Sequence, residues 1–135
     1  MLQDVRIVTT SIAVPWQVVY EFARQPSLLP QWASGLAAGI AEEGGRWFGQ
    51  SPMGRVQIEM TPDNPYGVLD HDVTLPDGTV FHNPLRAVAN GDGCELTFTV
   101  FRAVGADSAS FEKDCAHVTG DLQALKRLLE SAAHR

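Results

Sequence analysis

Several features that mark other classes of protein are missing from this sequence. No apolar run approaches the roughly 20 residues that a membrane-spanning helix needs, and the N-terminus lacks the charged and apolar regions of a signal peptide. Repeats, low-complexity tracts and linkers are also absent. We therefore expect a single domain over residues 1–135, with a cytoplasmic location.

Basic residues are few. The chain has 10 Lys and Arg against 16 Asp and Glu, which gives a formal net charge of -6. No cluster of Lys or Arg provides a local exception. Such a chain has no general attraction to phosphate backbones or to anionic membrane surfaces. The composition therefore argues against nucleic acid and membranes as partners.

Cysteine is scarce too, and the residues that could bind a metal ion do not form a cluster. The only two cysteines, Cys94 and Cys115, match no zinc-binding spacing and are expected to be reduced, and Cys115 is expected to be buried as a small apolar residue. His71 lies between Asp70 and Asp72, but the alternation of a strand sends it to the opposite face. The sequence therefore predicts no metal site and no cofactor.

A one-sided apolar stripe dominates the last third of the chain. Its members recur at steps of three or four residues, as expected for one face of a helix. They are Phe111, Cys115, Val118, Leu122, Leu125 and Leu129. The stripe predicts a helix from Ser108 to about Ala133 that lies on a broad apolar surface.

The rest of the chain predicts one strand, two short helices and a meander. A strand is expected over Gln3 to Ile12, a helix opening at Pro15 and ending before Pro26, and a second helix over Ser27 to Trp32. Short turns rich in Gly, Pro, Asn and Asp then separate six candidate strands, which makes the sheet antiparallel. These strands are Ile40 to Glu43, Arg46 to Gln50, Arg55 to Thr61, Gly67 to Leu75, Thr79 to Asn90, and Cys94 to Arg102.

The turns fix a register between these strands. A four-residue loop at 90–93 pairs Ala89 with Cys94, and a three-residue loop at 76–78 pairs Leu75 with Thr79. Followed outward, the first pairing places 87, 85 and 83 opposite 96, 98 and 100, and the second places 73, 71 and 69 beside 81, 83 and 85. Across the preceding turn, 56, 58 and 60 are expected opposite 71, 69 and 67. All of these positions share one almost wholly apolar face, and the residues that turn outward are Asp70, Asp72, His82, Arg86 and Glu95.

Two polar residues interrupt the apolar face. His71 and Asn83 are predicted to lie directly opposite each other and to point inward. Polar groups on a buried face need a protein partner, a ligand or water. They either form a hydrogen bond with each other as part of the core, or they hold the polar end of a ligand.

The order of elements resembles the helix-grip fold and, more specifically, the SRPBCC or START-like superfamily in its polyketide cyclase and lipid-transport branch. The segments that carry the resemblance are 12–15 (IAVP), 29–33 (LPQWA), 66–71 (YGVLDH), 84–86 (PLR) and 121–126 (DLQALK). The resemblance implies an α+β domain in which a curved antiparallel sheet of about seven strands wraps around a long C-terminal helix, with two short helices after the first strand. It also implies a chamber for lipids, polyketides or quinones, without a common catalytic motif.

The sequence therefore predicts a protein that binds a hydrophobic small molecule between the sheet and the last helix. The sheet side of the chamber would be formed by Leu69, His71, Val73, Phe81, Asn83, Leu85, Leu96, Phe98 and Val100. The helix wall would be formed by Phe111, Cys115, Val118 and Leu122. Two alternatives stay open: a polyketide cyclase or dehydratase with His71 as acid and base, and a protein-interaction module with a collapsed chamber. The sequence leaves open the ligand, any reaction and the oligomeric state.

Overall fold

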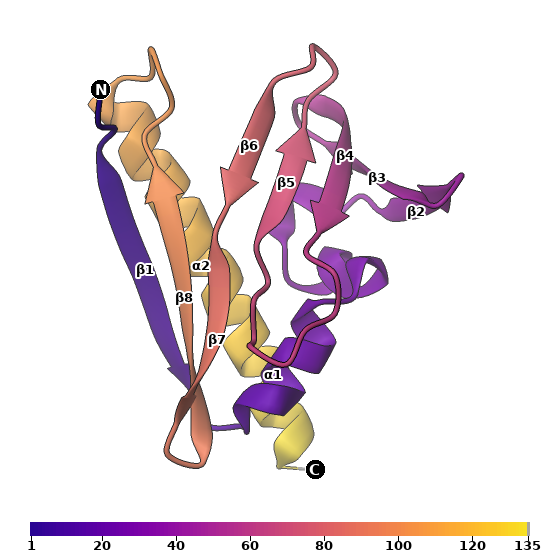
Figure 1. Cartoon of the computed structure of the whole chain (residues 1–135), viewed down its shortest axis with the longest axis vertical. Coiled ribbons are helices and arrows are strands. Elements are labelled where there is room, and N and C mark those ends of the chain that lie inside the picture. The colour runs from indigo at the N-terminus through magenta and orange to yellow at the C-terminus, as the bar shows by residue number, and fades with distance from the viewer. Residues whose placement is uncertain (135) are drawn as a thin grey trace.

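A computed structural model describes residues 1–134 (Figure 1). Within that range the chain forms eight strands, two α-helices and two short 3₁₀ helices. In chain order they are β1 (Val5–Ile12), α1 (Trp16–Ala23), η1 (Pro26–Gln31), η2 (Ser34–Leu36), β2 (Ile40–Glu43), β3 (Arg46–Ser51), β4 (Gly54–Met60), β5 (His71–Thr74), β6 (Val80–Asn83), β7 (Leu85–Asn90), β8 (Gly93–Phe101) and α2 (Ser108–Ala133). The chain thus adopts the α+β helix-grip arrangement that the sequence predicts.

The strands form two antiparallel sheets where the sequence predicts one. A three-stranded sheet has the order β1-β8-β7, and a five-stranded sheet has the order β2-β3-β4-β5-β6. The break falls at Pro84, which has no N–H group for a ladder, so the predicted strand 79–90 divides into β6 and β7. The backbone around Leu69 and Leu85 still joins the two sheets, with a hydrogen bond from Leu69 N to Leu85 O of 2.8 Å.

Above this junction the two sheets diverge, and β6 runs away from β8 in Figure 1. The β7–β8 ladder ends at Leu85 opposite Phe98. The predicted pairing of Asn83 with Val100 is therefore wrong, because the chain turns away at Pro84 before it reaches that position.

The C-terminal helix is confirmed almost to the residue. Asp107 caps it by accepting a hydrogen bond from the Ser110 N–H at 2.8 Å. Five of the six stripe residues are buried, and Val118 is partly exposed. The helix packs chiefly against β1 and β8, and not evenly against the whole sheet as the wrapped arrangement implies. Neither α2 nor α1, the α-helices of the described chain, has an apolar segment long enough to cross a membrane.

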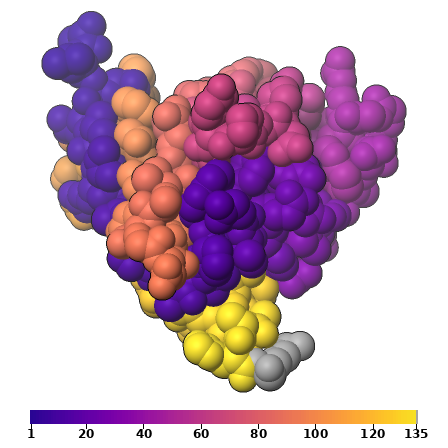
Figure 2. All heavy atoms as spheres, turned by 60° about the horizontal axis from the view of Figure 1, so that its bottom comes forward, coloured from indigo at the N-terminus to yellow at the C-terminus, as the bar shows by residue number. Residues whose placement is uncertain are grey.

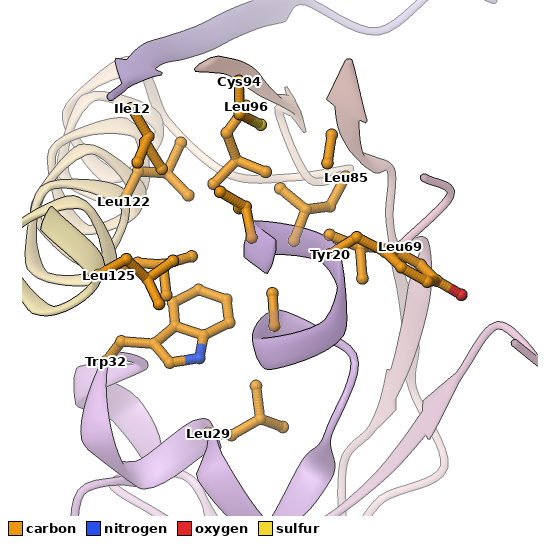
Figure 3. Packing of buried hydrophobic residues seen from close by; sticks show 14 of the residues in the cluster. Ile12, Tyr20, Leu29, Trp32, Leu69, Leu85, Cys94, Leu96, Leu122 and Leu125 are labelled. Carbon is orange, nitrogen blue, oxygen red and sulfur yellow. The ribbon is translucent and has the colours of Figure 1, made fainter. Parts of the chain in front are cut away.

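The main core lies between α2, α1 and the inner faces of both sheets. Figure 3 shows Leu122 and Leu125 of α2 facing Ile12 and Leu96, with Trp32 and Leu29 closing the cluster on the η1 side. A smaller cluster of Val100, Phe111 and Cys115 fills the space between β8 and the first turns of α2. In Figure 2, α1 (indigo to purple) occupies the centre of the face, between the β7–β8 hairpin and the end of α2.

Two of the predicted registers are confirmed and one is wrong. Ala89 pairs with Cys94, and His71 lies opposite Asn83. In the third pair, however, Ile58 faces Val73 and Met60 faces His71, a shift of four residues from the predicted alignment. An even shift keeps every side chain on its predicted face, because strand side chains alternate with a period of two.

The cause of the shift is a wide loop over residues 61–70. Asn64 organises it: its side-chain oxygen accepts from the Tyr66 and Val68 N–H groups, and its amide donates to the Val68 carbonyl at 2.9 Å. The Tyr20 hydroxyl fastens the loop to α1 by donating to Asp63 and accepting from the Asn64 N–H, both at 2.8 Å. The predicted strand 67–75 is consequently regular only over β5, with one isolated bridge at Val68.

The helical segments after β1 also differ in type. The predicted second helix forms as the 3₁₀ helix η1, with Pro30 inside it. Proline removes a donor that a longer α-helix would use, which suits a short 3₁₀ turn.

Candidate functional site

The structure divides the thirteen predicted chamber residues into two groups. Seven are at most 7% exposed and are close-packed in the core: Leu69, Leu85, Leu96, Val100, Phe111, Cys115 and Leu122. The other six keep contact with solvent although their positions are inward-facing: His71, Val73, Phe81, Asn83, Phe98 and Val118. We call these six the open inner face.

The exposure of the open inner face follows from the separation of the sheets. Val73 and Phe81 are opposite each other on β5 and β6, on the same face as the buried Ile58. Phe81 is nevertheless 37% exposed, because β6 belongs to the other sheet than β8 and neither core cluster of the described residues includes Phe81. Apolar side chains on an inward face that remain wet form a surface that an apolar molecule can cover.

His71 lies at the start of β5, in the middle of this face. Its Nδ1 is 3.0 Å from the Leu69 carbonyl oxygen. A carbonyl can only accept, so Nδ1 carries a proton, and in the neutral ring the lone pair is on Nε2. The ring meets Phe98 edge to face, with centroids 6.1 Å apart. Burial lowers the pKa of His71 below its ordinary 6.5, although the hydrogen bond to Leu69 opposes the shift. The ring is therefore uncharged at neutral pH.

Asn83 is the cross-strand partner of His71, but the two side chains are not joined. Within residues 1–134, no hydrogen bond connects the Asn83 amide to His71, and neither Nε2 of His71 nor that amide has another protein partner. The structure therefore contains no mutual hydrogen bond of the kind expected if the pair only served the core. Both groups are free to bond to water or to a ligand.

The outward side of these strands carries charge, as predicted, but Asp70 is less exposed than expected. Its carboxylate is 14% exposed because Arg86 binds it through two contacts of 2.8 and 2.9 Å and the Leu85 N–H donates to it. The hydrogen bond from Arg86 lowers the pKa of Asp70. Farther along, His82 pairs with Asp72 at 2.6 Å. This cluster holds the junction of the two sheets from outside.

A Ser, His and Asp cluster that sequence reasoning missed lies between η2 and α2. The Ser34 hydroxyl and N–H both donate to Asp121, at 2.8 and 3.1 Å, and His117 is 3.3 Å from the same carboxylate. Nε2 of His117 also lies 3.4 Å from Oγ of Ser34, but the single hydroxyl proton goes to the carboxylate and not to the imidazole, unlike in a catalytic triad. The cluster fastens η2 to the helix.

Groups for metal or thiol chemistry do not assemble in the described part of the chain. No three His, Cys, Asp or Glu side chains among these residues lie close enough to hold a metal ion. Cys94 and Cys115 are both free and buried. Burial raises the pKa of the Cys94 thiol to about 11, so it is protonated at neutral pH.

The predicted chamber residues do not include Met60, and the sequence does not reveal the unpaired indole nitrogen of Trp32. Met60 is opposite His71 and lines an open groove of about 520 Å³ beside the β2–β3 hairpin, although His71 and Asn83 do not line it. The alternation of side chains along β4 predicts the correct face for Met60. It does not predict His71 as the cross-strand neighbour of Met60, because the loop over residues 61–70 is longer than expected. Trp32 is 6% exposed, and its Nε1 has no hydrogen-bond partner. No sequence pattern signals that orphan donor.

Comparison with known proteins identifies similar folds but no matching sequence family. No family model matches the chain, and no curated protein sequence matches it. Solved structures do. XoxI from Bacillus cereus is 11% identical with a TM-score of 0.74, and the match covers 100% of both chains.

Two further solved structures also match the chain. DynU16, a protein of the dynemicin biosynthetic locus, is 20% identical with a TM-score of 0.72; the match covers 96% of this chain and 48% of DynU16. CalU16 from Micromonospora echinospora is 15% identical with a TM-score of 0.66, covering 93% of this chain and 73% of CalU16. The chain thus spans about half the length of DynU16. At these identities the matches establish a shared fold of antiparallel strands and a long C-terminal helix.

Proposed function

We propose that this chain binds a mostly apolar small molecule on the open inner face, with His71 and Asn83 contacting its polar group. One observation carries the proposal: inward apolar side chains stay partly exposed around Nε2 of His71 and the Asn83 amide, which lack protein partners within residues 1–134. Small-molecule sites combine a largely apolar lining with a few placed polar groups in this way.

The buried residues of the predicted chamber take a different role in this proposal. Leu69, Leu85, Leu96 and Leu122 form the floor beneath the ligand and do not contact it directly. Val100, Phe111 and Cys115 support the first turns of α2 on the side of β1. Contact with the ligand falls to the six residues of the open inner face, with Met60 beside them.

The fold matches support a binding role without identifying the ligand. DynU16 comes from a biosynthetic locus, and the sequence resembles the SRPBCC or START-like superfamily, whose members bind lipids, polyketides or quinones. A ligand of that kind, apolar with few oxygen atoms, suits a surface that offers mainly aliphatic and aromatic contacts.

A second candidate is an enzyme of the cyclase or dehydratase type with His71 as the base. The specific observation in its favour is an uncharged imidazole with a free Nε2. A general base must be unprotonated and within reach of the substrate proton. The enzyme would show turnover that falls as the pH drops through the pKa of His71, with ligand affinity nearly unchanged in a His71→Gln variant.

Mass spectrometry of small molecules that co-purify with the native protein tests the binding proposal. Val118→Trp should place a bulky ring on the open inner face and expel the bound molecule. Val88→Trp is the matched control, because Val88 is 54% exposed on the outer face of β7. Loss of the molecule in the first variant alone supports the site. Equal retention in both variants contradicts it, and the absence of any bound molecule or probe binding favours the interaction-module alternative.

A further inference from the structure

The hydrogen-bonding state of His71 is set by the backbone. Leu69 is 1% exposed, and its N–H donates to the Leu85 carbonyl, so the segment that bears the accepting carbonyl is held in place where the sheets join. The Leu69 carbonyl is 3.0 Å from Nδ1 of His71 and can only receive a proton. In the neutral ring Nε2 must then be an acceptor.

The two polar groups of the site therefore differ in the hydrogen bonds that they can form with a ligand. The Asn83 amide both donates and accepts, so it can bind a carbonyl, an ether or a hydroxyl. Nε2 of His71 can only accept. A ligand whose polar group is a ketone, an ester or an ether leaves that nitrogen without a partner, whereas a hydroxyl satisfies it.

The rings around His71 indicate what the hydroxyl is attached to. Phe98 meets the imidazole edge to face, and Phe81 adds a second, 37% exposed ring on β6. Aromatic side chains pack well against flat aromatic ligands. A phenolic hydroxyl is also a better donor than an aliphatic one.

We infer that the ligand is a hydroxylated aromatic molecule whose phenolic O–H donates to Nε2 of His71 while its ring system lies against Phe98 and Phe81. The inference rests on the proposed function and narrows it to one chemical class. Sites that hydrogen-bond a substrate hydroxyl discriminate strongly against analogues that lack it, because the protein group is left unpaired.

The test compares β-naphthol with its methyl ether, with affinities measured by titration calorimetry or by the probes' own fluorescence at neutral pH. The two probes have the same ring system, and both oxygens can accept a hydrogen bond from Asn83. Only β-naphthol can donate to His71. We expect β-naphthol to bind about tenfold more tightly than the ether.

Variants of His71 assign that preference to one atom. His71→Phe should bind the two probes equally, whereas His71→Gln keeps an acceptor near the same position and should keep part of the preference. His82→Phe is the control, because His82 is on the outward face and 61% exposed. Circular dichroism checks that His71→Phe folds. If it does not, the ratio of the two probe affinities in the wild type and in His71→Gln still tests the inference.

The outcomes separate the two proposals. Equal binding of both probes to the wild-type protein, or a preference for the ether, overturns the hydroxyl inference and leaves the binding site standing. A preference for β-naphthol that survives in His71→Phe also overturns the inference, because another protein group must then accept the hydrogen bond from the hydroxyl. If neither probe binds, the inference of an aromatic ligand is overturned, and the co-purification experiment decides the proposed function separately.

Discussion

The imidazole of His71 and the ring of Phe98 meet edge to face, with centroids 6.1 Å apart and planes inclined at 75°. His71 belongs to the five-stranded sheet and Phe98 to the three-stranded sheet. The contact thus bridges the two sheets close to the point at which they separate. It also shields one side of the imidazole from water, which ties the charge state of His71 to the stability of this junction.

Stability should decrease as the pH falls below about 6.5, through His71. Burial lowers the pKa of His71 in the folded state, although the charges of Asp70 and Asp72 oppose the shift. The unfolded chain therefore binds a proton at a higher pH than the folded chain does. The contribution of the uncharged His71 to stability is fully present above the pKa that His71 has in the unfolded chain. It is lost as the pH falls toward the pKa of His71 in the folded chain.

Urea unfolding at several pH values between about 7.5 and 5 measures this loss. The window lies above the ordinary pKa values of the carboxylates, so Asp70 and its neighbours contribute little to it. His71→Phe should show a flatter pH dependence than the wild type. An identical pH dependence in wild type and His71→Phe would show that the ring stays hydrated.

Asp70→Ala should destabilise the fold by about 1–3 kcal/mol. The substitution leaves the Leu85 N–H without its acceptor and removes both hydrogen bonds from Arg86, at the junction where the sheets are joined. Asp72→Ala is the control: its carboxylate is 43% exposed and pairs with His82 on the surface, so the loss should be below about 1 kcal/mol. Equal effects in chemical denaturation would mean that Asp70 is an ordinary surface residue.

Much of the fold could be predicted because it depends on local patterns. The stripe from Phe111 to Leu129 defines one face of a helix whatever surrounds it. The tight turns after Leu75 and Asn90 fix the pairing of the strands on either side. The first of these turns is enough to bring His71 and Asn83 face to face on neighbouring strands.

The long loop and the break between the sheets could not be predicted in the same way. The path of residues 61–70 depends on Asn64 and on the Tyr20 hydroxyl, which reaches it from a helix more than 40 residues earlier. The sequence shows that Pro84 has no backbone N–H to donate to a strand ladder. The direction in which β6 departs, however, depends on packing across the whole domain. That direction decides which chamber residues are buried in the core and which form the open inner face.

Leu122→Ala should cost about 2–5 kcal/mol of unfolding free energy. Leu122 is 1% exposed and packs in the main core beside Ile12 (Figure 3). Alanine keeps the helix propensity high, so the loss reports the removed apolar contacts and the cavity that they leave. Arg127→Ala on the exposed side of the same helix should change stability by less than about 0.5 kcal/mol. A loss below about 1 kcal/mol for Leu122→Ala would place this turn of α2 outside the core.

Trp32→Phe should be nearly neutral, within about 1 kcal/mol, although Trp32 is a large core residue. Its Nε1 is buried without a hydrogen-bond partner, which destabilises the native state, and phenylalanine removes that donor while it keeps most of the ring. Trp32→Ala, by contrast, should cost about 3–5 kcal/mol through the cavity. Urea denaturation followed by far-UV circular dichroism measures both. A loss above about 2 kcal/mol in the Phe variant would indicate that Nε1 has a bound water or ligand oxygen as its partner in solution.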